Sequence, residues 1–190
     1  MKRLLQLNWV NATIFSLFVS SFALAQNNTN TTCATALPVC PDNNFGLNIP
    51  SEIGSQNTAN EAPGTNYGCN SSQPNPLWYY MRVSTTGTAI FDLTQYTGMD
   101  QTGTGLDVDF TVWGPFESEH ACNELTADNV VDSSYDPTAY EVIDFYNGDG
   151  CGPEPTENPQ VVNAGEVYII MITNFSRQAG FINLIPRDEM

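Results

Sequence analysis

Apolar and polar side chains alternate along the segment Leu106–Phe116, LDVDFTVWGPF. Alternate side chains of a strand point to opposite faces, so Val108, Phe110 and Val112 share one face, whereas Asp107, Asp109 and Thr111 share the other. The pattern predicts a strand with one face in a hydrophobic core and the other toward water or a cation.

Further short apolar runs, separated by Gly, Pro and Asn, predict the rest of the fold. The other expected strands are Leu47–Ile49, Leu77–Ser84, Thr88–Thr94, Tyr140–Phe145, Glu166–Thr173 and Phe181–Ile185. Gly87 suggests a hairpin between the second and third of these, and Glu166–Thr173, apolar on both faces, is typical of a central strand. Ser118–Thr126 is expected to hold one short helix, because Ser118 suits its N-cap. Seven or eight short strands indicate an all-β, antiparallel, jelly-roll-like β-sandwich.

The first 25 residues have the pattern of an export signal. Lys2 and Arg3 form a positive start, Ile14–Leu24 is an apolar run, and Ala23-Leu24-Ala25 is a small-x-small cleavage site. A membrane anchor is the alternative, but Asn8 and Asn11 interrupt the apolar stretch. No second hydrophobic segment is long enough to span a bilayer, so we expect no membrane insertion after cleavage. We therefore expect a secreted or cell-surface protein with a signal peptide at 1–25, a flexible leader at 26–32 and a single β-sandwich domain at 33–190.

The chain is strongly acidic, with 21 Asp and Glu against five Lys and Arg, a formal net charge of −16. Two of the five basic residues, Lys2 and Arg3, belong to the expected signal peptide. Such a charge repels nucleic acids and anionic membranes, which require Lys and Arg to replace their counterions. It favours divalent cations or cationic partners, although solubility alone is a sufficient explanation.

Five cysteines in an exported chain indicate disulfide bonds. Proximity in sequence suggests the pairs Cys40–Cys69 and Cys122–Cys151, each closing a loop of about thirty residues. Cys33 is then left over; it could pair with Cys40 instead, with another chain, or with a cysteine outside this sequence. Spacing alone does not decide the connectivity.

The acidic face of the first strand is a candidate calcium site. Asp107 and Asp109, with Asp100 in the preceding loop and Glu117 beyond the strand, could supply the oxygen ligands that Ca²⁺ prefers, helped by carbonyls of Gly98–Gly105. The alternative is that these carboxylates are solvated or bonded to the backbone at a strand end.

Three aromatic residues form a second candidate site. Trp78, Tyr80 and Trp113 fall on strand faces opposite the expected core, and flat rings stack on sugars, so they are predicted to bind a ligand such as a polysaccharide. The alternative is that they pack beneath the long loop at 41–76.

The sequence offers little for catalysis. The chain has one histidine, His120, with no G-x-S-x-G or comparable nucleophile context, and no pair of its many carboxylates stands out as a glycosidase pair. We therefore expect a protein that is not an enzyme.

Four segments together resemble a known kind of module: NPLWYYMRVSTTGTAIFDL, DVDFTVWGPF, SSYDPTAYEVIDF and NAGEVYIIMITNFSRQAGFINLI. They are similar to a β-sandwich domain near the front of large secreted and cell-surface proteins of gliding, Bacteroidota-type bacteria. That domain is similar in style to the pre-peptidase C-terminal domain. The resemblance covers Cys33–Ile185.

The resemblance implies a surface or adhesion module, often exported by the type IX route, that binds polysaccharide or a surface protein. The chain departs from the pattern at Ser133, where a cysteine is common, which implies Cys151 as the partner of Cys122, and it has no sorting domain after Ile185. A structural subunit of an extracellular assembly is the alternative, and a glycoside hydrolase or protease-associated domain is less favoured.

Overall fold

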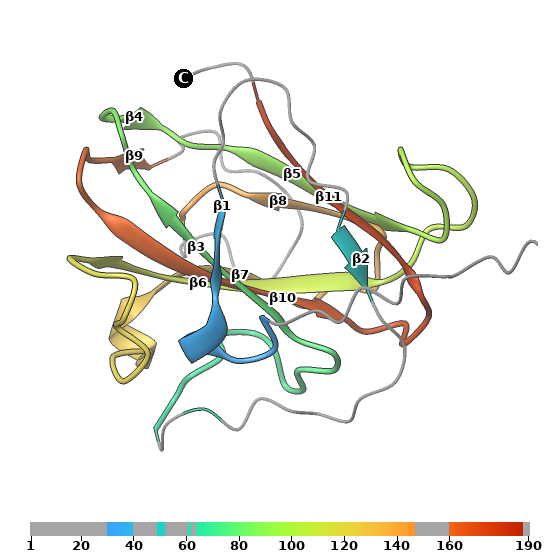
Figure 1. Cartoon of the computed structure of the whole chain (residues 1–190), viewed down its shortest axis with the longest axis horizontal. Helices are drawn as coiled ribbons and strands as arrows, with labels where there is room; N and C mark the ends of the chain where they lie inside the picture. Colours follow the sequence, from blue (N-terminus) through green and yellow to red (C-terminus); the bar gives the residue numbers. More distant parts are fainter. Residues whose placement is uncertain (1–29, 40–48, 52–60, 62–63, 147–159, 188–190) are drawn as a thin grey trace, which may run out of the picture.

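Two β-sheets face each other in the computed structural model, which describes residues 30–39, 49–51 (backbone only), 61, 64–146 and 160–187 (Figure 1). The five-stranded sheet has the order β1 (Leu37–Val39), β3 (Leu77–Arg82), β10 (Val167–Asn174), β6 (Val108–Phe116) and β7 (Val130–Ser134). The four-stranded sheet has the order β2 (Ile49–Ser51), β11 (Gly180–Pro186), β5 (Phe91–Tyr96) and β8 (Tyr140–Ile143). A two-stranded ribbon pairs β4 (Gly87–Thr88) with β9 (Val161–Val162), and two 3₁₀ turns, η1 (Cys33–Thr35) and η2 (Ala127–Asn129), complete the described elements.

The predicted all-β sandwich is confirmed. Neighbouring strands pair antiparallel, except that β1 runs parallel to β3. The apolar segment expected to be central is β10, which is buried along its whole length and pairs with β3 on one side and β6 on the other. The described residues hold no helix with the length and apolar character needed to cross a bilayer.

The hairpin expected around Gly87 is wrong. β3 lies in the five-stranded sheet and β5 in the four-stranded sheet, so the chain crosses between the layers, and Gly87–Thr88 pairs with β9 instead. Both segments have the alternation of a half-buried strand, but alternation does not show in which sheet a strand lies.

The main core fills the space between the two sheets. Phe91 and Leu93 of β5 meet Phe110 and Val112 of β6, all within 1% of complete burial. These are the inward faces that the alternation predicts, so the sequence pattern and the packing agree here.

A second core covers the outer face of the five-stranded sheet. Its buried side chains include Trp78, Trp113, Leu125, Ile169 and Met171, and the segments around η1 and Tyr67 lie over them. This layer explains why β3, β6 and β10 are buried on both faces.

One disulfide bond fastens this outer layer. Cys33 in η1 pairs with Cys122, with a Cα–Cα distance of 5.8 Å and a sequence separation of 89. The predicted pair Cys122–Cys151 is therefore wrong, because the fold, rather than sequence proximity, brings the partner of Cys122 within reach. Cys69 is also disulfide-bonded; Cys40 and Cys151 lie outside the described residues, so the pair Cys40–Cys69 stays a prediction.

The expected helix over Ser118–Thr126 does not form. The segment is a series of turns, in which the Ser118 hydroxyl accepts a hydrogen bond from His120 N at 3.2 Å, and only η2 after it is helical. A serine that bonds a nearby backbone N–H favours a turn as readily as a helix start.

Gly114 lies near the end of β6, where the strand passes close to Tyr168 of β10. Its φ is +151°, and a Cβ at this position would come within 2.6 Å of the Tyr168 ring. Only glycine therefore allows the strand to bend over β10 and deliver Phe116 to the outer layer.

Candidate functional site

The predicted calcium ligands lie in three different environments. Asp109 is within β6 and only 2% exposed, Asp107 precedes the strand and is partly buried, and Asp100 lies on an exposed loop with a φ of +54°. Asp100 is not among the charges that act on Asp107 or Asp109. The structure thus brings Asp107 and Asp109 together and leaves Asp100 apart.

Asp109 faces the outer layer from the middle of a sheet. The Thr173 hydroxyl on the neighbouring strand β10 donates to Asp109 Oδ2 over 3.5 Å, a long hydrogen bond. Burial, followed by the charge of Asp107, raises the pKa of Asp109 to about 8, and Thr173 lowers it only in part. A carboxylate this deep requires a proton or a cation to be stable.

Asp107 is anchored through its backbone. Its N–H donates to Ser176 Oγ at 2.7 Å, and its carbonyl accepts from Phe175 N at 3.2 Å, which fixes the turn after β10 against the start of β6. The carboxylate oxygen Oδ1 is buried without a hydrogen-bond partner. Burial, followed by the charge of Asp136, raises the pKa of Asp107.

Glu141 is a member of this group that the sequence analysis missed. It lies on β8 opposite the inward-facing Leu93, with a residue exposure of 0%. The Ser134 hydroxyl is near enough to lower its pKa, yet neither carboxylate oxygen has a hydrogen bond of good geometry. Burial, helped by the charges of Asp109, Asp136 and Asp107, raises the pKa of Glu141 to about 8. Glu141 lies two residues before the apolar Ile143 in the same predicted strand, so the alternation of the sequence places both on the inward face. This was the signal that could have identified Glu141 as buried.

Two further oxygen atoms without a partner lie on the inner face of the five-stranded sheet, the side of Glu141. Asn174 pairs in register with Val108, and Ser134 pairs with Phe110, so both side chains share the inward face of these residues and not the outward face of Asp109. Asn174 Oδ1 and Ser134 Oγ are buried, and neither has a hydrogen bond. We call Asp107, Asp109, Asp136 and Glu141, with these two oxygens, the acidic end.

The acidic end has the chemistry of a hard-cation site rather than of a transition-metal site. Its unpartnered atoms are carboxylate, amide and hydroxyl oxygens, the ligand type that Ca²⁺ prefers. Within the described ranges no three His, Cys, Asp or Glu side chains converge so as to hold a metal ion. A site here would therefore rest on two carboxylates at most, completed by amide, hydroxyl or water oxygens.

The residues of the predicted aromatic site do not form an exposed surface. Trp78 and Trp113 are 0% exposed, and Tyr80 is partly buried against the same outer core. Tyr67 contacts the Trp113 ring edge-on, so the part of the loop that is described covers these rings. The prediction of exposed rings at Trp78 and Trp113 is therefore wrong, because β6 and β3 have a covered outer face.

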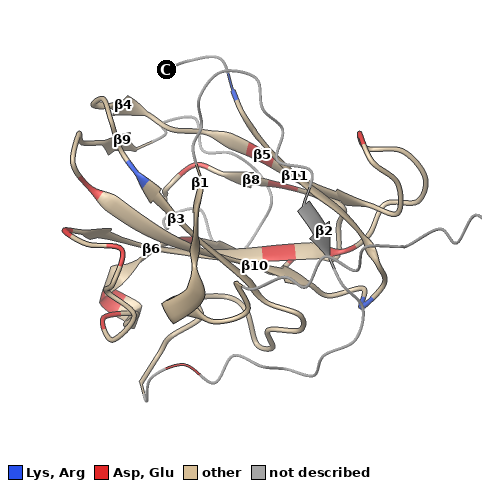
Figure 2. Cartoon of the chain, in the orientation of Figure 1, with Lys and Arg blue, Asp and Glu red and all other residues tan. Residues whose placement is uncertain are grey.

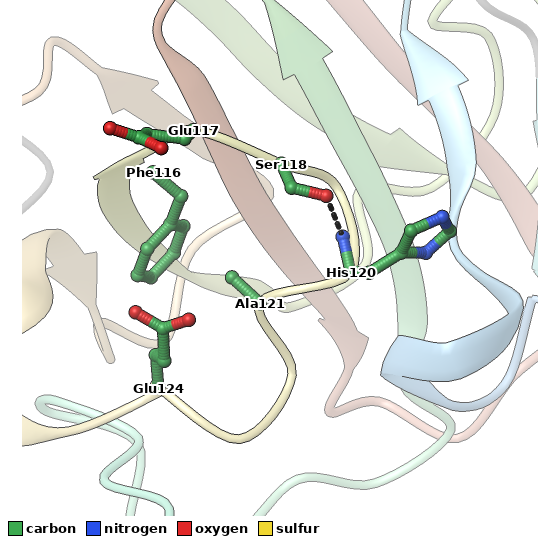
Figure 3. A pocket seen from close by; sticks show the side chains of 6 residues that line it. All are labelled: Phe116, Glu117, Ser118, His120, Ala121 and Glu124. Carbon is green, nitrogen blue, oxygen red and sulfur yellow. Dashed lines mark hydrogen bonds between the residues drawn. The ribbon is translucent and has the colours of Figure 1, made fainter.

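A pocket of about 310 Å³ opens elsewhere, beside the end of β6 (Figure 3). Its lining residues are Phe116, Glu117, Ser118, His120, Ala121 and Glu124. The Glu117 and Glu124 carboxylates lie on two sides of the Phe116 ring, whereas the His120 imidazole points away from all three (Figure 3). The lone histidine is thus not placed as a base or acid between these carboxylates.

Comparison with known proteins gives one structural similarity. No family model matches the chain, and no curated protein matches it. A solved structure, described as the pre-peptidase C-terminal domain of a collagenase from Bacillus anthracis, is similar over 80% of this chain and 94% of that chain, with a TM-score of 0.36 and 10% sequence identity. The strand pairing described above, and not this similarity, establishes that the protein is an all-β sandwich.

Proposed function

We propose that the protein is a secreted, non-catalytic binding module, stabilised by Ca²⁺ at Asp107 and Asp109, that holds polysaccharide or a surface protein. The observation that carries the proposal is the pair Asp107 and Asp109: Asp109 is buried beside the charge of Asp107, and Asp107 Oδ1 is buried without a hydrogen-bond partner.

Ca²⁺ would offset the repulsion between the carboxylates of the acidic end. Asp109 and Glu141 are buried carboxyls whose charged forms repel each other and Asp107. A divalent cation stabilises the charged form of such groups and accepts amide and hydroxyl oxygens with them. Asp100 is not part of this proposal, and Asp136 adds to the negative potential around the two buried carboxyls without being a third ligand.

Because the tryptophans are buried, we assign the ligand-binding surface to the turn after β10 instead. Phe175 is 38% exposed and meets Tyr135 edge-on, with ring centroids 5.5 Å apart. Phe175 N also donates to the carbonyl of Asp107, so an ion at Asp107 would order this aromatic pair. Exposed rings beside polar loop groups are suited to stacking on sugars.

The pairing of Cys33 within the chain weakens the alternative of a structural subunit crosslinked through that cysteine. Secretion is supported by the disulfide bonds, which persist in oxidising compartments.

A thermal melt with CaCl₂ or EDTA tests the cation. Saturating CaCl₂ should raise Tm by about 5 to 10 °C, and Asp109→Asn should abolish most of the rise, whereas Asp100→Asn should keep it. Equal melts with CaCl₂ and EDTA would remove the ion from the proposal. Binding of Phe175→Ala to polysaccharide arrays, compared with the unchanged protein, tests the ligand surface separately.

A further inference from the structure

We propose that the pocket beside the end of β6 binds the side chain of an arginine carried by a partner protein. The pocket is separate from the acidic end and from Phe175, so this inference does not depend on the calcium proposal.

The floor of the pocket is apolar. Phe116 is 7% exposed and Ala121 is 6% exposed, so both are packed into the outer core, and only a small part of each residue faces the pocket. Such a floor accepts the methylene stem and the flat guanidinium of arginine, which is only weakly hydrated on its faces.

The rim of the pocket is negative and not neutralised. Glu117 and Glu124 are both exposed, and within the part of the chain that is described neither carboxylate has an ion pair or a hydrogen bond. They lie on two sides of the Phe116 ring, so a group resting on that ring would lie between them (Figure 3). The acidic segments of this loop form one of the densest negative regions in Figure 2.

The same loop already binds an arginine within the chain. Arg82 Nη2 donates to Glu119 Oε2 at 2.6 Å. The other two arginines of the described residues are Arg187, which pairs with Asp92, and Arg177, which follows β10. None of the described arginines forms an ion pair with Glu117 or Glu124, so both carboxylates are open to a cation that a partner supplies.

The chemistry of the pocket favours arginine over a metal ion or lysine. A guanidinium can reach two carboxylates through its planar fork of donors, and its weakly hydrated faces suit the small exposed part of Phe116. The disulfide at Cys122, next to Ala121, holds the loop to η1, so the pocket exists before binding and less ordering is required.

The test is an NMR titration of the oxidised, ¹⁵N-labelled protein with acetyl-Gly-Arg-Gly-amide. The peptide should shift backbone amides of residues 116–124 with a Kd on the order of 1 mM, as expected for exposed ion pairs of about 1 kcal/mol added to ring stacking. The uncharged citrulline peptide should cause no shift there, and the lysine peptide should bind more weakly.

Matched variants separate a site from the general negative field. The double variant Glu117→Gln/Glu124→Gln should weaken arginine binding by about fivefold or more, whereas Asp100→Asn/Asp128→Asn, which removes the same charge from two other exposed carboxylates, should change it by less than about twofold. Phe116→Leu should remove the preference for arginine over lysine.

Three results would overturn the inference. These are an equal loss of binding in the two double variants, equal binding of the citrulline peptide, and shifts of the same amides by CaCl₂ at lower concentration than by the arginine peptide. All altered carboxylates are exposed, so a dispersed amide spectrum is expected from each double variant and confirms that the fold is intact.

Discussion

The indole rings of Trp78 and Trp113 stack with their centroids 5.5 Å apart and their planes 15° apart. They lie on the outer face of β3 and β6, the two strands that flank β10, and Tyr67 contacts the ring of Trp113 edge-on. The two indoles differ in one respect: Trp113 Nε1 donates to the carbonyl of Asn66 at 2.7 Å, whereas Trp78 Nε1 is buried without a hydrogen bond.

This difference predicts unequal effects of the same substitution. Trp113→Phe removes a hydrogen bond and leaves the Asn66 carbonyl without its donor, whereas Trp78→Phe removes a donor that had no partner. Urea unfolding should show that Trp113→Phe lowers the free energy of unfolding by about 1 kcal/mol more than Trp78→Phe does. Equal losses would mean that the Asn66 contact contributes nothing to stability.

The disulfide Cys33–Cys122 should stabilise the protein more than a bond between near neighbours would. It closes a loop with a sequence separation of 89, for which the chain-entropy relation gives about 4 to 5 kcal/mol. We expect the double variant Cys33→Ser/Cys122→Ser to lose this much in the free energy of unfolding, measured in urea under oxidising conditions. A loss below about 1 kcal/mol would show that the outer layer holds η1 without the bond.

Asp132 closes the gap between the edge strands β7 and β8. Its Oδ2 accepts from Asp144 N at 2.8 Å and from Phe145 N at 3.0 Å, and the side chain is buried. Asp132→Ala would leave two backbone donors without an acceptor, so we expect a loss of about 2 to 4 kcal/mol in the free energy of unfolding. Asp132→Asn keeps an oxygen for these donors and should lose less than half of that; hydrogen exchange at the two amides provides a local measurement.

The acidic end should make stability depend on pH in an unusual direction. The pKa values of Asp109 and Glu141 are raised to about 8 in the folded protein, whereas unfolded carboxyls titrate near pH 4. From about pH 4 to pH 8 the folded state therefore binds more protons than the unfolded state, and the free energy of unfolding falls as the pH rises. Without calcium, chemical denaturation across this range should show the fall.

Neutral variants and calcium should both flatten that dependence. Glu141→Gln removes the buried charge, and we expect it to be more stable than the unchanged protein at pH 8 by on the order of 1 to 3 kcal/mol, with little difference at pH 4. CaCl₂ should stabilise more at pH 8 than at pH 5, because it competes with protons. An unchanged slope in Glu141→Gln would exclude this residue as the source.

The sequence predicts well which side chains of a strand share a face. It predicts poorly which other segments of the chain cover that face. Alternation identifies Phe110 as core, but it places Trp113 at a surface because it holds no information on the remote segment, around Tyr67, that covers the outer face. In the same way, the partner of Cys122 is set by the layering of the fold and not by chain distance. The sequence brings Asp107 and Asp109 together because they are two residues apart at the start of one predicted strand, whereas Glu141 lies in the opposite sheet and is joined to them only by the tertiary structure.

The central strand of the larger sheet is made late in synthesis. β10, at Val167–Asn174, is the strand that joins β3 to β6, and both of those precede it by more than fifty residues. Until β10 is available the two earlier strands have no shared neighbour, and contacts so distant in sequence form slowly. The larger sheet can therefore close only after residues 167–174 have left the ribosome, which delays the docking of β3 and β6 until then.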